Sequence, residues 1–532
     1  MKYWIIGLGL LAGLAILGTR GFGKEGSDGA RWWSHVEALA GDDLEGRDTG
    51  SVGHRKAAEY VAREFARAGL QPAGTEGFFQ PVKFRSKEID EANTRVELVG
   101  EDGRAEPLAL GPDAIVSLRV DPAPSVDAAM VFAGFGLANA EAKHDDFAGL
   151  DVKGKVVVYL AGAPSTIAGP LAAHMQSAGE RGDLLRRLGA IGTVVIQNPK
   201  NMDIPWERSS LARFMPSMSL ADPAMDDNRG LFIGLGLNPA KADKLLAGSG
   251  HTIAEILKAA DSGQPLPHFV LPKRLKATVA VKRSLVTSQN VAAVLPGNDP
   301  KLKGEYVVFS AHLDHIGVGK PINGDAIYNG AMDNASGVAA MLDVAAMLKE
   351  SGTKLRRSVL FVAVTGEEKG LLGSKFFANF PTVDPKAIVA DINTDMFLPL
   401  FPMKRLTVYG IDESDLGDDA STVAKALGVA PEPDPEPKRN VFIRSDQYSF
   451  IRRGVPSIAL KVGFAKGSPE EQVAKKWLTE RYHAPSDDLN QPVDKAAAGA
   501  FDALVARLLE QVANRDERPR WKKSSFFKRF AG

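Results

Sequence analysis

The stretch SVLFVAVTGEEKGLLGS, residues 358–374, decides the fold class of this chain. Its first seven residues form an uninterrupted run of strand formers, a pattern typical of a strand that is buried on both faces. The run stops at Gly366, and two glutamates, Glu367 and Glu368, follow side by side. Adjacent carboxylates repel each other, and one polar residue would be enough to end a strand. The pair therefore indicates a functional role.

The segments around this strand follow the same pattern. Apolar strands are predicted within EYVVFSAHLD (305–314), KAIVADINTDM (386–396) and VPSIALKVG (455–463). Between the first of these and residue 358 lies DNASGVAAMLDVAAMLKESG (333–352), a run of helix formers that ends at a glycine. Buried strands that alternate with helices predict an α/β domain with a mixed, largely parallel sheet sandwiched by helices.

Histidines and acids follow the carboxyl ends of these strands, where open α/β sheets form their sites. Each alone has a structural explanation; Asp333, for example, could cap the following helix. Together, uncompensated acids at one sheet edge would be costly, and one or two divalent cations would remove the cost. Mixed histidine and carboxylate ligation suits zinc, with manganese or cobalt as substitutes. The candidate residues are His312, Asp314, Asp333, Glu367, Glu368, Asp395 and His483.

Composition excludes several other classes of protein. The 532 residues contain no cysteine, so disulfide frameworks, thiolate nucleophiles and cysteine metal sites are absent. Basic and acidic residues both number 65, which gives no indication of a nucleic-acid partner. The sequence has neither an H-E-x-x-H nor a G-x-S-x-G motif. GLDVKGKV (149–156) imitates a phosphate-binding loop, but Val156 replaces the Ser or Thr and a strand follows.

The two ends of the chain differ from its centre. Residues 1–24 begin with one lysine and continue with an apolar stretch, which predicts a signal peptide or a membrane anchor and hence an exported, periplasmic or extracellular protein. Cleavage and retention both stay open. The basic, aromatic tail at 516–532 is expected to be solvated or frayed, with contact to a membrane surface as the less favoured alternative.

Six motifs in order, SAHLDH, GAMDNASG, GEEKGLLGS, NTDM, IRSDQYSF and RYHAPSD, resemble those of the co-catalytic di-zinc aminopeptidases. That family also includes glutamate carboxypeptidase II, glutaminyl cyclase and the non-enzymatic transferrin receptor. The resemblance implies a zinc-exopeptidase fold and peptide substrates. FAGFGL and FAGLDVKGKVVVYL resemble the family's β-rich protease-associated (PA) insert. The implied divisions are 30–118 for the first part of the peptidase domain, 119–275 for the PA-type insert, and 276–515 for the catalytic domain.

The resemblance also implies a set of metal ligands. His312 and Asp395 would hold one zinc ion, and Glu368 and His483 would hold the other. Asp333 would bridge the two ions, which lie about 3.5–4 Å apart in such sites. All five ligands are present, which argues against the non-catalytic branch of the family.

Three further residues receive roles from the same resemblance. Glu367 would be the general base and acid, Tyr482 would donate to the developing oxyanion, and Arg444 would contact the bound substrate. Successive strand residues point in opposite directions, so Glu368 is expected to turn towards a metal while Glu367 turns towards the attacking water.

Two aspartates are implied to support the histidine ligands. Asp314 would orient His312, and Asp487 would orient His483, because a ligating imidazole normally donates its second N–H to a partner. His315, one residue past Asp314, has no role assigned by the pattern.

The function implied by these residues is that of an exported metallopeptidase that removes N-terminal residues with two zinc ions and a glutamate base. Carboxypeptidase or dipeptidase cleavage and glutaminyl cyclisation at the same site stay open, as does a non-catalytic binding protein of the receptor type. The Pro-rich acidic loop 428–440 is either a stiff linker or a substrate lid. The preferred substrate residue and the oligomeric state cannot be read from the sequence.

Overall fold

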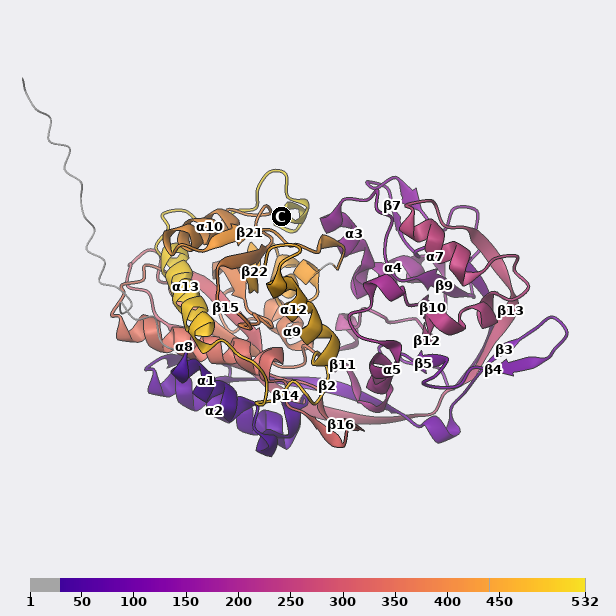
Figure 1. The fold of residues 1–532 in the computed structure, drawn as a ribbon, viewed down its shortest axis with the longest axis horizontal. Helices are drawn as coiled ribbons and strands as arrows, with labels where there is room; N and C mark the ends of the chain where they lie inside the picture. The colour runs from indigo at the N-terminus through magenta and orange to yellow at the C-terminus, as the bar shows by residue number, and fades with distance from the viewer. Residues whose placement is uncertain (1–28, 440, 532) are drawn as a thin grey trace, which may run out of the picture.

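The computed structural model describes residues 29–439 and 441–531. The predicted signal or anchor segment lies outside these residues. None of the helices that the structure describes combines the length and apolarity needed to cross a membrane. The described chain contains two large sheets, one in the left half and one in the right half of Figure 1.

The first sheet confirms the predicted mixed α/β class. Its strand order is β11-β2-β14-β18-β15-β19-β22-β20-β21, with β1 paired to β14. The four central strands, β18, β15, β19 and β22, run parallel, and the strands on either side pair antiparallel with them. The strands span β1 Gln71–Pro72, β2 Phe79–Ile89, β11 Ser217–Leu220, β14 Val281–Leu295, β15 Tyr306–His312, β18 Ser358–Val364, β19 Ile388–Asn393, β20 Arg405–Tyr409, β21 Ala430–Glu432 and β22 Ser457–Gly463.

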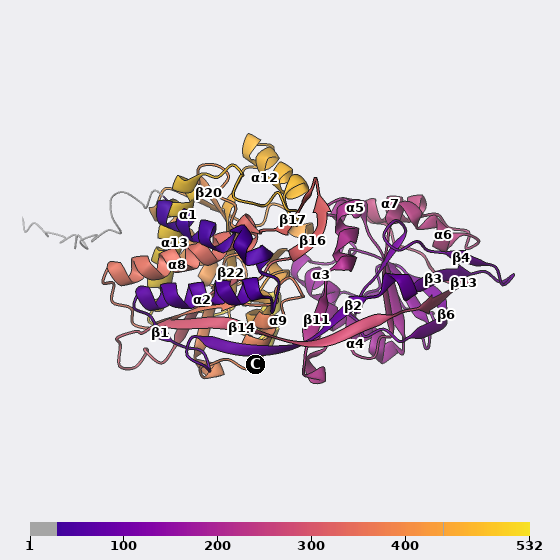
Figure 2. The same ribbon diagram turned by 90° about the horizontal axis from the view of Figure 1, so that it is seen from below.

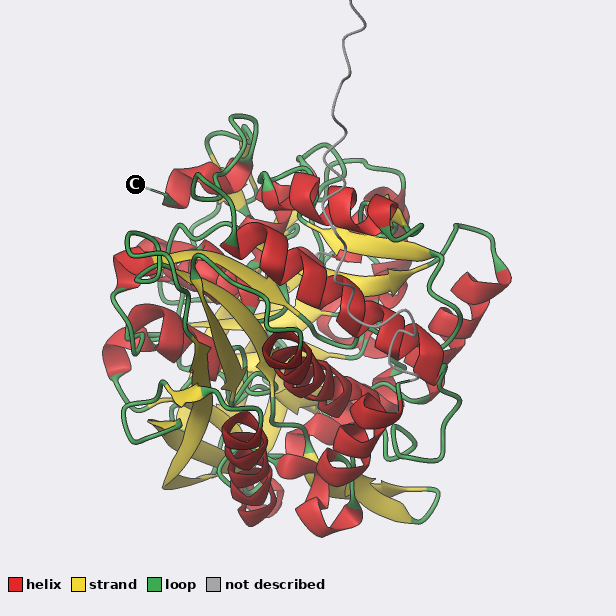
Figure 3. Cartoon of the chain, turned by 90° about the vertical axis from the view of Figure 1, so that its left-hand side faces the viewer, coloured by secondary structure: helices red, strands yellow, loops and turns green. Residues whose placement is uncertain are grey.

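Helices cover both faces of this sheet, as Figure 3 shows. Every residue of β18 and β19 is buried, which explains why their sequences lack polar alternation. Phe309 and Phe361 face one layer of helices, whereas Val308 and Leu360 belong to a separate core on the opposite face. The helices of this unit are α1 Ala30–Leu39, α2 Val52–Arg67, α8 Ser336–Glu350, α9 Leu372–Asn379, α10 Leu416–Ala426, α11 Gln447–Ile451, α12 Pro469–Glu480 and α13 Lys495–Ala513.

The second sheet has the order β4-β3-β13-β6-β9-β10-β12-β5 and its own hydrophobic core. It starts earlier than the division at residue 119 that was drawn from the sequence, because β3, β4 and β5 already pair into it. The PA type of this unit stays a prediction. The strands span β3 Arg95–Val99, β4 Ala105–Pro107, β5 Ala114–Val116, β6 Ser125–Ala133, β9 Val156–Leu160, β10 Gly192–Ile196, β12 Ile233–Leu237 and β13 His268–Thr278.

Short helices and hairpins complete the two units. The helices beside the second sheet are α3 Gly169–Gln176, α4 Ala178–Leu188, α5 Trp206–Ser209, α6 Asp243–Leu246 and α7 Ile253–Asp261. Two small hairpins are formed by β7 Ala138–Asn139 with β8 His144–Asp145 and by β16 Gly317–Ile322 with β17 Asp325–Tyr328.

Two long strands connect the units. β2 and β14 pair antiparallel over the whole range from Phe79 to Ile89, and Figure 2 shows them running from one unit towards the other. β11 returns from the residues of the second unit to the edge of the first sheet, where it pairs with β2. The units therefore share a continuous backbone ladder rather than a single flexible linker.

The C-terminal tail is packed, and the expectation that it is solvated or frayed was wrong. Phe527 is fully buried, and Trp521 is buried with its indole N–H donating to the carbonyl oxygen of Gly454 at 2.9 Å. Phe526 and Phe530 contact the ring of His174 on α3. The aromatic residues of the tail thus fill the space between the two units, since their burial outweighs the charges around them.

Candidate active site

The parallel strands of the first sheet bring the predicted residues together at their carboxyl ends. His312 is the last residue of β15, Glu367 and Glu368 follow β18, and Asp395 follows β19. Asp333 precedes α8, which starts at Ser336. His483 comes after α12 and completes the cluster. Parallel strands share one carboxyl edge, so residues far apart in sequence become neighbours.

One part of the cluster surrounds His312. Its Nε2 atom lies 3.3 Å from Asp333 Oδ1 and 3.4 Å from Asp395 Oδ1. The imidazole and Asp333 are almost fully buried. These three side chains present atoms that all lie within 4.8 Å of one another, an arrangement that could hold a metal ion.

The other part surrounds His483. Its Nε2 atom lies 3.3 Å from both Asp333 Oδ2 and Glu368 Oε2. Asp333 therefore faces both histidines, one with each oxygen. The backbone of His483 has a φ of 53°, a left-handed conformation that is costly for a residue with a side chain. Such strain persists only where the surroundings hold it, as they do at functional sites.

His315, which the sequence pattern left without a role, belongs to the same cluster. Its Nδ1 atom lies 2.8 Å from Glu368 Oε1, and His315, Asp333 and Glu368 form a second group that could hold a metal ion. Neither of these two close atoms makes a hydrogen bond of acceptable geometry. Buried polar atoms normally find partners, so these orphaned atoms fit a site built around a cation.

Burial and neighbouring charges strongly shift the pKa values of the side chains in the cluster. Burial, followed by the carboxylates of Asp395 and Glu368, raises the pKa of Glu367 well above its usual value, although His312 opposes this. Burial disfavours the charged form of His483, but Glu368 and Asp333 outweigh it and raise the pKa of His483 to about 10. Perturbed groups that converge in a pocket are typical of active sites.

The two adjacent glutamates diverge for a different reason than the one expected. β18 ends at Val364, so Glu367 and Glu368 lie in a turn and not in a strand. The N–H groups of Gly370 and Leu371 donate to the carbonyl oxygen of Glu367 and close this turn. Turn geometry, rather than strand alternation, directs Glu368 to the histidines while Glu367 lines the pocket.

Asp314 supports this turn with its side chain. Its carboxylate accepts the backbone N–H groups of Glu367 and Glu368, at 3.0 and 3.3 Å, and the hydroxyl of Thr49 at 3.0 Å. The Nδ1 atom of His312 instead contacts the backbone carbonyl oxygen of Asp314 at 3.0 Å. His312 is therefore oriented by the main chain, which differs from the expected carboxylate contact.

Asp487 also acts on the backbone. Its carboxylate accepts the N–H groups of Met332 and Asp333, at 2.9 and 3.0 Å, and an amide N–H of Gln491 at 2.7 Å. The expected contact was with His483, but the carboxylate instead fixes the segment that carries Asp333. A carboxylate that accepts several N–H groups holds such a segment firmly.

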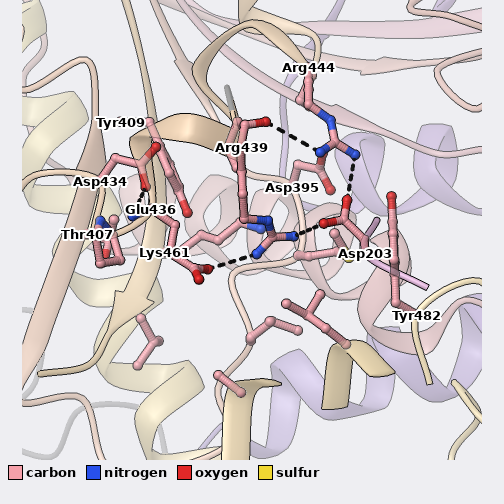
Figure 4. A pocket seen from close by; sticks show the side chains of 18 of the residues that line it. Asp203, Asp395, Thr407, Tyr409, Asp434, Glu436, Arg439, Arg444, Lys461 and Tyr482 are labelled. Atoms are coloured by element: carbon pink, nitrogen blue, oxygen red, sulfur yellow. Dashed lines mark hydrogen bonds and ion pairs between the residues drawn. The ribbon is translucent and has the colours of Figure 1, made fainter. Parts of the chain in front are cut away.

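A pocket opens beside the cluster, and Figure 4 shows the residues that line it. Tyr482 lines this pocket, and its ring packs on that of His483 with the ring centres 3.9 Å apart. Arg444, which was expected to contact substrate, also lines it, but its guanidinium pairs with Asp203 at 2.9 Å. Arg439 pairs with the other oxygen of Asp203 at 2.7 Å.

Sequence reasoning assigned no role to Asp203 and Lys461, which both line this pocket. The loop 428–440, left open as a linker or a lid, contributes Asp434, Glu436 and Arg439 to its wall. Asp203 belongs to the segment after β10, in the second unit, and no local pattern connects it with a site formed by the first sheet. The nearby Arg208 donates to the carbonyl oxygens of Leu478 and Glu480, 3.3 and 3.5 Å away, at the end of α12. The second unit therefore contributes directly to the wall of the pocket.

Comparison with known proteins agrees with this geometry. Residues 290–509 match the model of Peptidase family M28. Over 227 residues the chain is 29% identical to leupeptin-inactivating enzyme 1 of Streptomyces exfoliatus, a match that covers 41% of this chain and 47% of the relative. It is 28% identical to the probable leucine aminopeptidase 2 of Aspergillus oryzae, with 38% and 40% covered. The matched part therefore spans less than half the length of either relative.

A solved structure extends the similarity beyond the matched region. The aminopeptidase from Aneurinibacillus sp. strain AM-1 aligns over 93% of this chain and 94% of its own, with a TM-score of 0.55 and 19% identity. At this identity the likeness shows a shared fold. The strands and motifs of the cluster lie within residues 290–509, and it is this part of the chain that matches peptidase family M28.

Proposed function

We propose that this chain is an exported zinc-dependent aminopeptidase that hydrolyses N-terminal residues from peptides. The observation that carries the proposal is the convergence of two histidines and three carboxylates around Glu367 at one sheet edge. Similarity to the Aspergillus leucine aminopeptidase supports the same class of reaction. The residues proposed to hold two zinc ions are His312, Asp333, Glu368, Asp395 and His483.

The donor set suits zinc. Imidazole nitrogens and carboxylate oxygens are its usual ligands in proteins without cysteine, and this chain has no cysteine. The unpartnered atoms of His315 and Glu368 favour a cation at this position, so His315 is a further candidate ligand. When bound, the metal would polarise the scissile carbonyl and lower the pKa of a water molecule.

The protein side chains would carry the proton transfers. Glu367 lines the pocket beside the proposed ligands, so it would take a proton from the attacking water and pass it to the leaving amine. Tyr482 would donate its hydroxyl proton in a hydrogen bond to the carbonyl oxygen as charge develops there. Asp314 and Asp487 would hold the backbone of the turn and of the Asp333 segment in place.

The proposal also includes where the protein acts and how its domains are organised. The apolar segment within residues 1–24 would direct export, as a cleaved signal or a retained anchor, and residues 119–275 would form the core of a PA-type insert. Asp203, which this insert presents to Arg439 and Arg444, would make it part of the substrate pocket.

A substrate-profile assay on the purified full chain tests the proposal. Metal content is measured by elemental analysis, and hydrolysis is followed with aminoacyl-anilides and with N-blocked and C-blocked peptides. We expect bound zinc, cleavage of substrates with a free N-terminus, and loss of activity on chelation that zinc restores. Cleavage of N-blocked peptides from the C-terminus would instead assign a carboxypeptidase. A pure protein that lacks metal and activity would favour a binding function.

A further inference from the structure

The charged residues of the pocket differ in whether they have partners. Four lysine and arginine side chains line it, and three of them are paired. Arg439 and Arg444 share Asp203, and Arg439 also pairs with Glu436 at 3.0 Å. Lys475 pairs with Glu471 at 2.7 Å. Figure 4 shows the arginine pairs as a connected group on one side of the pocket.

Lys461 is the exception. Among the residues that the structure describes, no carboxylate lies within ion-pair distance of its ammonium group, and no hydrogen-bond acceptor contacts it. Its one recorded contact is with the ring of Tyr409, whose centre lies 6.0 Å from Nζ. Lys461 is partly buried. Burial lowers its pKa, whereas the carboxylates of Asp395 and Asp333 oppose the shift without lying within ion-pair distance. A partly buried cation with no paired carboxylate can bind an incoming anion.

The position of Lys461 in the sheet directs it into the pocket. Lys461 is the only charged residue of β22, and Ile458, Leu460 and Val462 pack into the main core. Because successive strand residues alternate between faces, Lys461 points away from that core. Thr407 lies opposite it on β20. The strand therefore places Lys461 in the wall of the pocket.

The surroundings of Lys461 fit a short acidic side chain. Met396, Leu398 and Phe401 line the same pocket and offer apolar surface to methylene groups. Asp434, one of the acids that line the pocket, accepts the N–H of Glu436 at 2.8 Å. Asp395 and Asp333, which also act on Lys461, are proposed to hold metal. Burial also raises the pKa of Asp434, which weakens its competition for the ammonium group.

We propose that Lys461 determines substrate specificity by pairing with the side-chain carboxylate of an N-terminal glutamate or aspartate. This inference rests on the proposed aminopeptidase function, because the same pocket contains Glu367, Tyr482 and His483. A leucine side chain would leave the ammonium group unpaired, and a lysine or arginine side chain would be repelled by it.

The test compares glutamyl-, glutaminyl-, leucyl- and lysyl-anilides on the zinc-loaded full chain. We expect kcat/KM for the glutamyl substrate to exceed that for the glutaminyl substrate by about 10-fold to 100-fold, the range expected for one hydrogen-bonded ion pair. Lys461→Met should remove this preference mainly through KM, and Lys461→Arg should keep part of it. Lys476→Met, an exposed lysine of α12 outside the pocket, is the matched control.

Two outcomes with the anilide substrates would overturn the inference. One is a wild-type enzyme that does not prefer glutamyl over glutaminyl and leucyl substrates. The other is a Lys461→Met enzyme that loses activity equally on all of them. A third arm uses N-acetylated peptides with a free C-terminus: if only their cleavage depended on Lys461, the lysine would bind a terminal carboxylate, and the assignment would be wrong.

A binding measurement separates this inference from the proposed reaction. Calorimetry with free glutamate and with leucine on the zinc-loaded protein needs no turnover. Tighter binding of glutamate that Lys461→Met abolishes, with unchanged zinc content and melting temperature, would support the assignment even if no anilide were cleaved. Equal binding of both amino acids by the wild type would refute it independently of any activity.

Discussion

The two sheets of this protein are built alike at their centres but differ in what their strand ends carry. Both contain four parallel strands flanked by antiparallel ones. In the second sheet, Asn198 and Asn238 follow β10 and β12, and their side chains accept N–H groups of their own turns. In the first sheet, the side chains after β15, β18 and β19 face one another instead.

The difference teaches that parallel strand ends permit a site but do not create one. Polar groups that bond to their own turn have no capacity left for a ligand. The side chains of the first sheet face groups from other strands and so remain available to bind a ligand. A bound cation would relieve the repulsion between their carboxylates. The following predictions test this contrast, from the largest expected effect to the smallest.

Replacement of Glu367, the proposed base beside the first sheet, should have the largest effect. Glu367→Gln keeps the shape of the side chain but cannot accept a proton, so kcat should fall by about 10²–10⁴-fold. Zinc content and melting temperature should stay at wild-type values. Glu101→Gln, the same change at an exposed turn of the second unit, should leave kcat unaltered. Wild-type turnover in Glu367→Gln would remove Glu367 from the mechanism.

Loss of a ligand should instead be visible in metal content. Glu368→Ala removes the carboxylate that faces both His315 and His483, so we expect less zinc per chain by elemental analysis, together with loss of activity. Excess zinc should restore activity in part. Full zinc occupancy in this variant would count against Glu368 as a ligand.

A buried acid in the second unit should affect stability alone. Asp146 lies near His144 and His268, at 3.0 and 3.3 Å, but its carboxylate also accepts the N–H groups of Phe135 and Leu137. Asp146→Ala should cost about 1–3 kcal/mol in unfolding free energy, measured by denaturant titration, because these N–H groups lose their acceptor. Zinc content and kcat should not change; a drop in zinc would show that the second unit also binds metal.

The contact between the units should give the smallest effect. Asp203→Ala removes the shared partner of Arg439 and Arg444, and partly exposed ion pairs contribute only about 0.2–1 kcal/mol. We expect KM to change by about 5-fold or less while kcat is retained. Asp127→Ala, which breaks an exposed pair with Arg274 far from the pocket, is the control. A large loss of kcat would mean that the second unit positions the reacting groups themselves.

Much of the catalytic unit could be predicted from the sequence. Uninterrupted apolar runs such as 358–364 and 388–393 indicated buried parallel strands, because burial on both faces leaves no polar alternation. The motifs at their ends indicated His312, Asp333, Glu368, Asp395 and His483, which the structure brings together. These signals are local, since each strand and its terminal side chain lie within a few residues.

Other features were decided by contacts between distant parts of the chain. The tail looked solvated because its charges are visible in sequence, whereas the cavity that accepts Phe527 is not. Asp314 and Asp487 were assigned to histidine rings but accept backbone N–H groups, and only folded geometry selects among donors within reach of a carboxylate. Glu367 and Glu368 diverge through a turn whose closure depends on Asp314.

By itself, the sequence determined the fold class, the order of the strands that carry chemistry and the types of side chain at their ends. The fold class and the strands can be predicted because periodicity and local composition indicate how each segment is buried. Only the tertiary structure decided that Asp203 reaches the pocket from the second unit and that Lys461 has no ion-pair partner there among residues 29–439 and 441–531. Whether a charge is paired depends on residues hundreds of positions away, and no local pattern records them.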